Sequence, residues 1–272
     1  MSQLSGPADM LLAHPDVWRA DRIEPRSQGI GTGHHALDAL LIDRGWPKAG
    51  LVEVLSGQIG IGEVRLLGPA LAALSVDERR WIAWIDPPHV PYAPALAEIG
   101  VDLGKLLWVR PKSPEDALWA TEHATKSGSC SAVLAWLDES KLTPKDIRRL
   151  KLATRRGESL TVLFRPDEAA QRQSMAELRI LLKGTTKPDR LSVEIVKRRG
   201  GWPIEQLELP LSHRTTQISR FDLRERLTTW RSGHWRLRNL HRIDRPSVVP
   251  NSIGIGVSSH SNEPHRTPTQ QV

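Results

Sequence analysis

A glycine-spaced turn at residues 56–65 carries the pattern closest to a chemical site. Its sequence, SGQIGIGEVR, follows one apolar run and opens another with helical spacing. A phosphate-binding loop has a glycine, four residues, a second glycine, a lysine, and then serine or threonine. Gly57 and Gly62 hold the glycine positions, but Glu63 stands at the lysine position and Val64 at the hydroxyl position. The contacts to the β and γ phosphates and to Mg²⁺ are therefore predicted to be missing, and no cofactor is expected.

The charge of Glu63 works against nucleotide binding. A carboxylate about 4 Å from a phosphate charge repels it by roughly 4 kcal/mol at an effective dielectric of about 20. The same carboxylate in a first helical turn can satisfy amide groups and the helix dipole, worth roughly 0.3–1 kcal/mol. We expect Glu63 to replace phosphate within the loop, and Pro69 to kink the helix that follows. The alternative is that the glycines only form a strand-to-helix turn.

Alternating apolar runs and helical spacings predict the elements that hold this turn. The pattern favours an α/β fold with a mostly parallel sheet and helical crossovers. Ser113 and Thr143 each precede a proline and place an acid three residues on, which predicts two helix starts. Later strands separated by tight turns predict an antiparallel edge to the sheet. The predicted strands are 51–55, 81–85, 106–109, 132–137, 160–164, 178–182, 191–196 and 206–209.

Composition limits the setting and the partners. The net charge is +7 and the isoelectric point is about 9.9, which favours an acidic partner, with nucleic acid the leading candidate. Cys130 is the single cysteine, so an internal disulfide framework is excluded and a reducing cytoplasm is expected. No apolar run reaches the roughly 20 residues needed to span a bilayer, so no membrane contact is predicted.

Seven segments form a specific set along the chain: GWP at 45–47, GIGEVRLL at 60–67, WIDPPHVPYAP at 84–94, LWA at 118–120, AW at 135–136, RRL at 148–150 and VKRRGG at 196–201. Together they resemble the ImuA family, which is often labelled SulA-like, and the order of motifs over residues 28–200 resembles the RecA core. The resemblance implies a RecA-like domain at 28–211 with a degenerate phosphate-binding loop. Around it we expect an N-terminal helical segment at 1–27, a basic and helical arm at 212–245, and a disordered tail at 246–272.

The resemblance also implies that the catalytic positions of RecA are vacant. Pro87 or Pro88 replaces the glutamate that activates water, and Trp136 replaces the acid that orders magnesium. Asp138 lies one or two residues late and is interpreted as a loop acid. Neither a carboxylate nor a second histidine has ligand spacing with His89, so no metal site and no enzyme activity are predicted.

By resemblance to the ImuA family, the expected function is a non-catalytic accessory role in SOS-induced translesion DNA synthesis. The implied partners are an ImuB-type polymerase relative and an error-prone DnaE-type polymerase, with RecA and DNA as further candidates. The alternative is a SulA-like division inhibitor that binds FtsZ; a working DNA-dependent ATPase is disfavoured by the loop. Basic and aromatic residues are the candidate contacts with nucleic acid or a partner: Arg148, Arg149, Lys151, Arg155, Lys197, Arg198, Arg199, Arg224, Trp230, Arg231, Trp235, Arg236 and Arg238.

Overall fold

Eight strands form one sheet in the order β3-β2-β4-β5-β1-β6-β7-β8 in the computed structural model, which describes residues 28–211. The strands from β3 to β6 in this order pair in parallel, whereas β6, β7 and β8 pair antiparallel. The mostly parallel sheet with an antiparallel edge is therefore confirmed. The strands are β1 (Leu51–Ser56), β2 (Trp81–Ile85), β3 (Leu106–Val109), β4 (Cys130–Trp136), β5 (Leu160–Arg165), β6 (Leu178–Gly184), β7 (Arg190–Lys197) and β8 (Ile204–Pro210).

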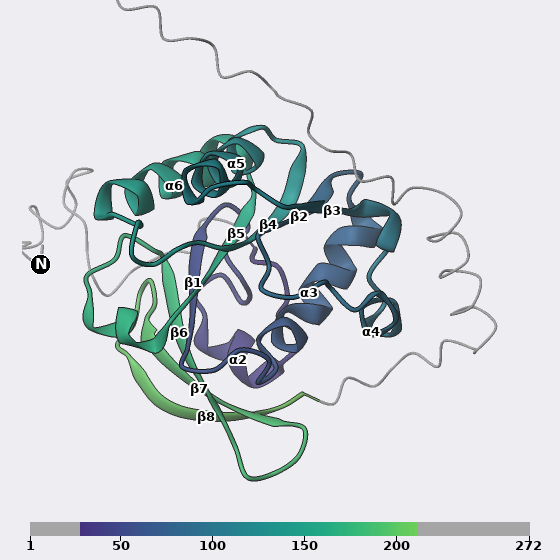
Figure 1. Ribbon diagram of the computed structural model, residues 1–272. Helices are drawn as coiled ribbons and strands as arrows, with labels where there is room; N and C mark the ends of the chain where they lie inside the picture. The colour runs from purple at the N-terminus through teal and green to yellow at the C-terminus, as the bar shows by residue number, and fades with distance from the viewer. Residues whose placement is uncertain (1–27, 212–272) are drawn as a thin grey trace, which may run out of the picture. The chain divides into compact units, whose positions relative to one another are not determined.

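Helices cover both faces of the sheet, as Figure 1 shows. On one face, α6 packs through Ile147 and Leu150, and α5 through Leu118, against strand residues such as Leu163. On the other face lie α2, α3 and α4, which contribute Leu37, Leu66 and Leu96, in that order, to the larger apolar core. The helices are α2 (His35–Leu40), α3 (Glu63–Asp77), α4 (Ala93–Ile99), α5 (Pro114–Lys126) and α6 (Pro144–Gly157), with 3-10 turns η1 (Leu103–Lys105) and η2 (Asp167–Gln171).

Both predicted helix starts are confirmed. The Ser113 hydroxyl accepts a hydrogen bond from the amide of Asp116 at 3.1 Å and begins α5. Thr143 and Asp146 form a reciprocal capping box that begins α6. Pro69 does not end α3, which continues from Glu63 to Asp77 around it.

A buried carboxylate ties β1 to the strands on either side. Glu53 accepts hydrogen bonds from Arg165 Nη1 on β5 at 2.8 Å and from Arg179 Nε on β6 at 2.7 Å. The Ser174 hydroxyl donates to the same carboxylate, and Glu139 accepts from two further guanidinium nitrogens of Arg165 at 2.7 and 2.9 Å. Burial alone would lower the pKa of Arg165, but these two carboxylates hold that pKa above its usual value.

Several predictions fall on residues that the structure does not describe. The helical segment at 1–27, the basic arm at 212–245 and the tail at 246–272 all lie outside the described residues. Within residues 28–211, no helix is long and apolar enough to cross a membrane.

Candidate functional site

The carboxylate of Glu63 fills the loop that follows β1. Its Oε1 accepts a hydrogen bond from the amide of Gly60 at 2.8 Å, and its Oε2 accepts one from the amide of Gly62 at 3.1 Å. Only 7% of Glu63 is exposed. Gly60 and Gly62 have φ angles of 85° and 119°, a region that favours glycine. The side chain thus makes, within the loop, the amide contacts expected of a substitute for phosphate.

The side chains of Asp167 and Leu211 pack against the same loop. A Cβ atom at Gly57 would lie 2.7 Å from Oδ2 of Asp167, and one at Gly62 would collide with the side chain of Leu211. Arg65 Nη2, in the first turn of α3, donates to the Leu211 carbonyl at 3.1 Å. Two carboxylates therefore lie against a loop whose backbone would otherwise suit a phosphate, and their charges oppose phosphate binding.

The residues that the resemblance to RecA sets at the magnesium and water-activation positions have side chains that cannot perform those roles. Val64 is half-buried against the apolar core and has no oxygen to offer a metal. The nearby Ser56 hydroxyl is engaged inside the loop, where it accepts from the Gln58 amide at 3.1 Å. Pro87 and Pro88 follow β2 and carry no group that could accept a proton.

Acids and the histidine near the carboxyl ends of the strands do not converge on one site. Asp86 is exposed, with a φ of 51°. Asp138 is also exposed, and hydrogen bonds from the Ser140 hydroxyl and amide, at 2.7 and 2.9 Å, hold its pKa below the usual value. His89 is exposed on the loop after β2. Across residues 28–211, no group of three histidine, cysteine or acidic side chains is placed to hold a metal.

Three aromatic rings occupy the ends of the neighbouring strands. Trp136 on β4 stacks on Phe164 on β5, with ring centroids 4.2 Å apart and planes 6° apart. Trp84 on β2 lies 5.7 Å from Trp136. The apolar core thus extends to the carboxyl ends of these strands, where the resemblance to RecA predicted that Trp136 replaces a magnesium-ordering acid.

Basic residues of α6 are partly engaged within the domain. Arg149 forms ion pairs with Asp146 at 3.3 Å and with Glu122. Arg155 lies 3.9 Å from Glu177, whereas Arg148 is exposed and has no ion pair with any residue of the described range. The sequence prediction that Arg148, Lys151 and Arg155 share a face is consistent with their spacing along α6.

Lys197 at the end of β7 lies within electrostatic range of α6. Its Nζ donates to the carbonyl of Ser174 at 2.7 Å. Burial, followed by the positive charges of Lys151 and Arg179, holds its pKa below the usual value. Two of the predicted basic groups, Lys151 and Lys197, are therefore brought near one another by the fold.

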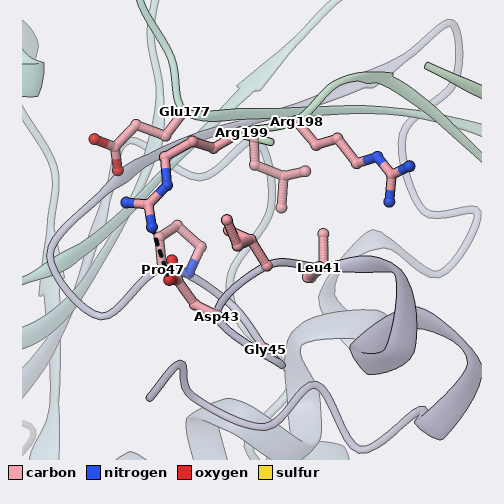
Figure 2. Close-up of a pocket in the computed structure, with 9 residues that line it drawn as sticks. Leu41, Asp43, Gly45, Pro47, Glu177, Arg198 and Arg199 are labelled. Atoms are coloured by element: carbon pink, nitrogen blue, oxygen red, sulfur yellow. Dashed lines mark hydrogen bonds and ion pairs between the residues drawn. The ribbon is translucent and has the colours of Figure 1, made fainter. Parts of the chain in front are cut away.

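The neighbouring Arg198 and Arg199, which follow β7, instead bind groups of their own domain. Figure 2 shows Arg199 reaching Asp43, with which it forms an ion pair at 3.1 Å. Arg198 donates to the carbonyls of Leu40 and Trp202. These two arginines thus join the turn after β7 to the end of α2 and to the segment that follows α2. The remaining predicted contacts lie outside the described residues: Arg224, Trp230, Arg231, Trp235, Arg236 and Arg238.

Exposed apolar side chains are a feature that the sequence reasoning missed. Ile59 is 63% exposed, Val90 66%, Tyr92 71% and Trp202 86%. Ile59 lies within the glycine-spaced loop, while Val90 and Tyr92 lie in a proline-rich loop after β2. The available signal was the presence of large apolar residues among turn-forming glycines and prolines, where burial in a core is uncommon.

Residues 54–161 match the family model described as cell division inhibitor SulA. The cell division inhibitor SulA of Edwardsiella piscicida is 33% identical over 122 residues, covering 45% of this chain and 71% of that protein. The chain belongs to the SulA family. The SulA of Photorhabdus laumondii is 34% identical over 115 residues, covering 42% of this chain and 63% of that protein. The crystal structure of SulA from Pseudomonas aeruginosa aligns with 26% identity and a TM-score of 0.36, over 44% of this chain and 99% of that one.

Membership of the SulA family corrects the predicted function. The expected accessory role in translesion synthesis is wrong, as are the ImuB-type and DnaE-type polymerase partners, because the relatives are named as inhibitors of cell division. The SulA-like part of the resemblance is confirmed, whereas its ImuA-specific part is not supported. Many of the motifs behind the prediction, such as the loop at 60–67, build strands, turns and helix starts, and a shared scaffold does not specify a partner.

The SulA match and the basic candidates overlap only in part. The matching span, residues 54–161, contains the Glu63 loop, the loop after β2 and α6. Strands β6, β7 and β8, with Lys197, Arg198 and Arg199, lie beyond that span. A function shared across the SulA family is therefore best sought on the elements from β1 to α6 and their connecting loops.

Proposed function

We propose that this protein inhibits cell division by binding FtsZ, as a non-catalytic member of the SulA family. The observation that carries the proposal is the 33% identity over 122 residues with a protein named cell division inhibitor SulA. The chain covers 71% of that relative and 63% of the next, so the activity of the whole relative is extended to this chain as a proposal.

The loop after β1 supports an action by binding. Glu63 already occupies the amides of Gly60 and Gly62, and Asp167 lies beside Gly57. A loop held in this way has a fixed shape without a nucleotide, and a preformed surface loses little conformational entropy when a partner binds. In this proposal the protein acts by binding FtsZ, so its effect is proportional to the amount of protein present.

The proposal also includes a more distant relationship with RecA-like proteins, which the sheet and the loop after β1 support. A mostly parallel sheet with a glycine-spaced turn after β1 is compatible with a RecA-like origin in which Glu63 has taken the place of phosphate. Induction by DNA damage and action in the cytoplasm, where FtsZ would be met, complete the proposed role. Both follow from kinship with SulA and have their own simple tests in reporter expression and cell fractionation.

Purified FtsZ tests the proposal directly. Adding the full chain at increasing ratios should lower FtsZ polymerisation and GTP hydrolysis in proportion to the amount added, and controlled expression should produce filamentous cells. A stoichiometric dependence distinguishes occupation of FtsZ from a catalytic effect. Unchanged polymerisation and hydrolysis at a several-fold excess of folded protein would overturn the proposal.

A further inference from the structure

The span that matches SulA presents its exposed large apolar residues in three places. Ile59, Val90 and Tyr92 follow the carboxyl ends of β1 and β2. Val76 and Trp81 lie at the opposite edge, at the end of α3 and the start of β2, and Leu152 lies on α6. The first group is the largest, and it defines what we call the carboxyl-edge surface.

Sheet topology brings the two loops of this surface to one edge. β1 and β2 belong to the same parallel set, with β4 and β5 between them, so their carboxyl ends point the same way. The helices that follow, α3 and α4, lie on the same face of the sheet (Figure 1). They are in contact, because a Cβ atom at Gly100 would lie 3.6 Å from Cβ of Ala72. Ligands of parallel α/β sheets commonly bind at this edge.

The chemistry of the carboxyl-edge surface fits a protein. Residues 57–62 carry no charged side chain, and residues 87–94, with the sequence PPHVPYAP, carry no acid, lysine or arginine; their ionisable groups are His89 and Tyr92. The cores of protein interfaces are depleted of charge and enriched in aromatic residues. A phosphate backbone would require lysines and arginines, which these two loops lack. The two loops therefore present an apolar surface, bordered by the exposed acid Asp86, that suits a protein partner better than a phosphate backbone.

The loop that carries Ile59 is held from both sides. Glu63 binds the amides of Gly60 and Gly62, and the Ser56 hydroxyl binds the amide of Gln58. Ile59 lies between these two anchored segments, so its side chain is exposed on a backbone that is already fixed. Preorganisation of this kind favours binding because little ordering remains to be done.

We propose that Ile59, Val90 and Tyr92 form the surface that contacts FtsZ, and that Glu63 is a positioning residue for Ile59. This inference rests on the proposed function, because FtsZ is the partner that the SulA family suggests. It adds the contact surface and gives the altered phosphate-binding loop a role as a protein-docking loop.

Binding to purified FtsZ tests the surface with the full chain. Ile59→Ser and Tyr92→Ser should each raise the Kd for FtsZ about tenfold. The double variant should raise it by roughly a hundredfold, as expected for central interface residues. Val76→Ser is the matched control, because Val76 is 68% exposed at the opposite edge. Its Kd should stay within about threefold of the unaltered chain. Thermal unfolding must show that each variant is folded.

The positioning role of Glu63 has a separate test. Glu63→Ala should speed hydrogen exchange at the amides of Gly60 and Gly62 and weaken FtsZ binding by about tenfold. Glu63→Gln retains one carbonyl oxygen as an acceptor and should restore part of the affinity. Faster exchange in Glu63→Ala with unchanged affinity would overturn the positioning role.

The outcomes separate the two levels of the proposal. If the unaltered chain does not bind FtsZ, both the proposed function and this surface are overturned. If the unaltered chain binds and the folded Ile59 and Tyr92 variants bind equally well, only the surface is overturned. A change confined to self-association of these variants, measured by sedimentation, would instead assign the surface to a second copy of the chain and would also overturn the inference.

Discussion

Glu53 and Glu63 are two buried carboxylates ten positions apart, and they are held in opposite ways. Glu53 accepts hydrogen bonds from side chains on β5 and β6, which are 112 and 126 residues distant in the sequence. Glu63 accepts from two amides within three residues of itself. The first carboxylate therefore belongs to the architecture of the sheet, and the second to the shape of one loop.

The two carboxylates therefore differ in how much of the fold depends on them. Removing Glu53 leaves two arginines buried without their shared partner, and the cost falls on the whole fold. Removing Glu63 releases backbone amides near the surface, where water can replace the lost acceptor. Burial alone would not separate the two cases, because both side chains have little exposed area. The sequence distance to their hydrogen-bond donors does separate them.

The largest effect is expected for Glu53→Ala. Loss of the carboxylate leaves Arg165 and Arg179 buried with unbalanced charge, so the free energy of unfolding should fall by about 3–5 kcal/mol. Urea unfolding followed by circular dichroism measures this change. Arg172→Ala is the control, because Arg172 is an exposed partner of Glu139 and should cost less than about 1 kcal/mol. Equal losses of unfolding free energy in the two variants would show that the buried ion pairs of Glu53 matter no more than an exposed one.

A smaller loss is expected for Glu63→Ala. Two hydrogen bonds disappear, but the freed amides lie in a partly exposed loop, so the free energy of unfolding should fall by about 1–2 kcal/mol. The same urea titration measures it, and the slope of unfolding free energy against urea should stay unchanged. A loss as large as that of Glu53→Ala would show that the loop supports the whole sheet.

Cys130 is a third buried ionisable group, and unlike the two carboxylates it stays neutral. Burial raises the pKa of its thiol from 9.0 to about 11, against a smaller opposing effect of Arg80. At pH 8 the native thiol should react with a disulfide reagent about 100-fold more slowly than in urea, because it forms less thiolate. Since only the unfolded thiol ionises between pH 9 and pH 11, the stability that Cys130 contributes should fall as the pH rises through that window. Native and unfolded reaction rates that are equal would contradict the burial.

Nucleotide addition should produce the smallest effect. Mg-ATP at micromolar concentrations should give no binding heat in calorimetry, because Glu63 and Asp167 oppose its phosphates. Glu63→Lys alone should not create ATP hydrolysis, since Val64 and the prolines after β2 remain. Micromolar affinity in the unaltered chain would mean that the Glu63 carboxylate is easily displaced.

Local signals made much of the fold predictable. Strands such as 81–85 and 106–109 have the bounds given by their apolar runs, and Ser113 and Thr143 begin helices through contacts within three residues. The network around Glu53 was not predictable in this way. Its acid lies in an apolar strand, LVEVL, and its arginines come from distant strands, so only the sheet order brings them together.

The site was predictable in its chemistry but not in its partner. The sequence was sufficient to expect that Glu63 would satisfy loop amides, because the contact is local. The sequence did not indicate that some basic candidates are engaged within the domain. Arg149, Arg198 and Arg199 bind groups of their own domain. The exposure of Ile59 and Tyr92 was also missed, because an apolar residue in a turn carries no sign of which way it faces.

The place of β1 in the sheet has a consequence for synthesis of the chain. β1 is made early, yet its two neighbours are β5 and β6, which end at residues 165 and 184. While the ribosome adds the intervening residues, both edges of an apolar strand have no native partner. Such pairing over long sequence distances is slow to form and leaves strand edges open to aggregation. We therefore expect folding to be completed only after most of the sheet has been translated, and nascent chains that stop before residue 165 to need protection by chaperones.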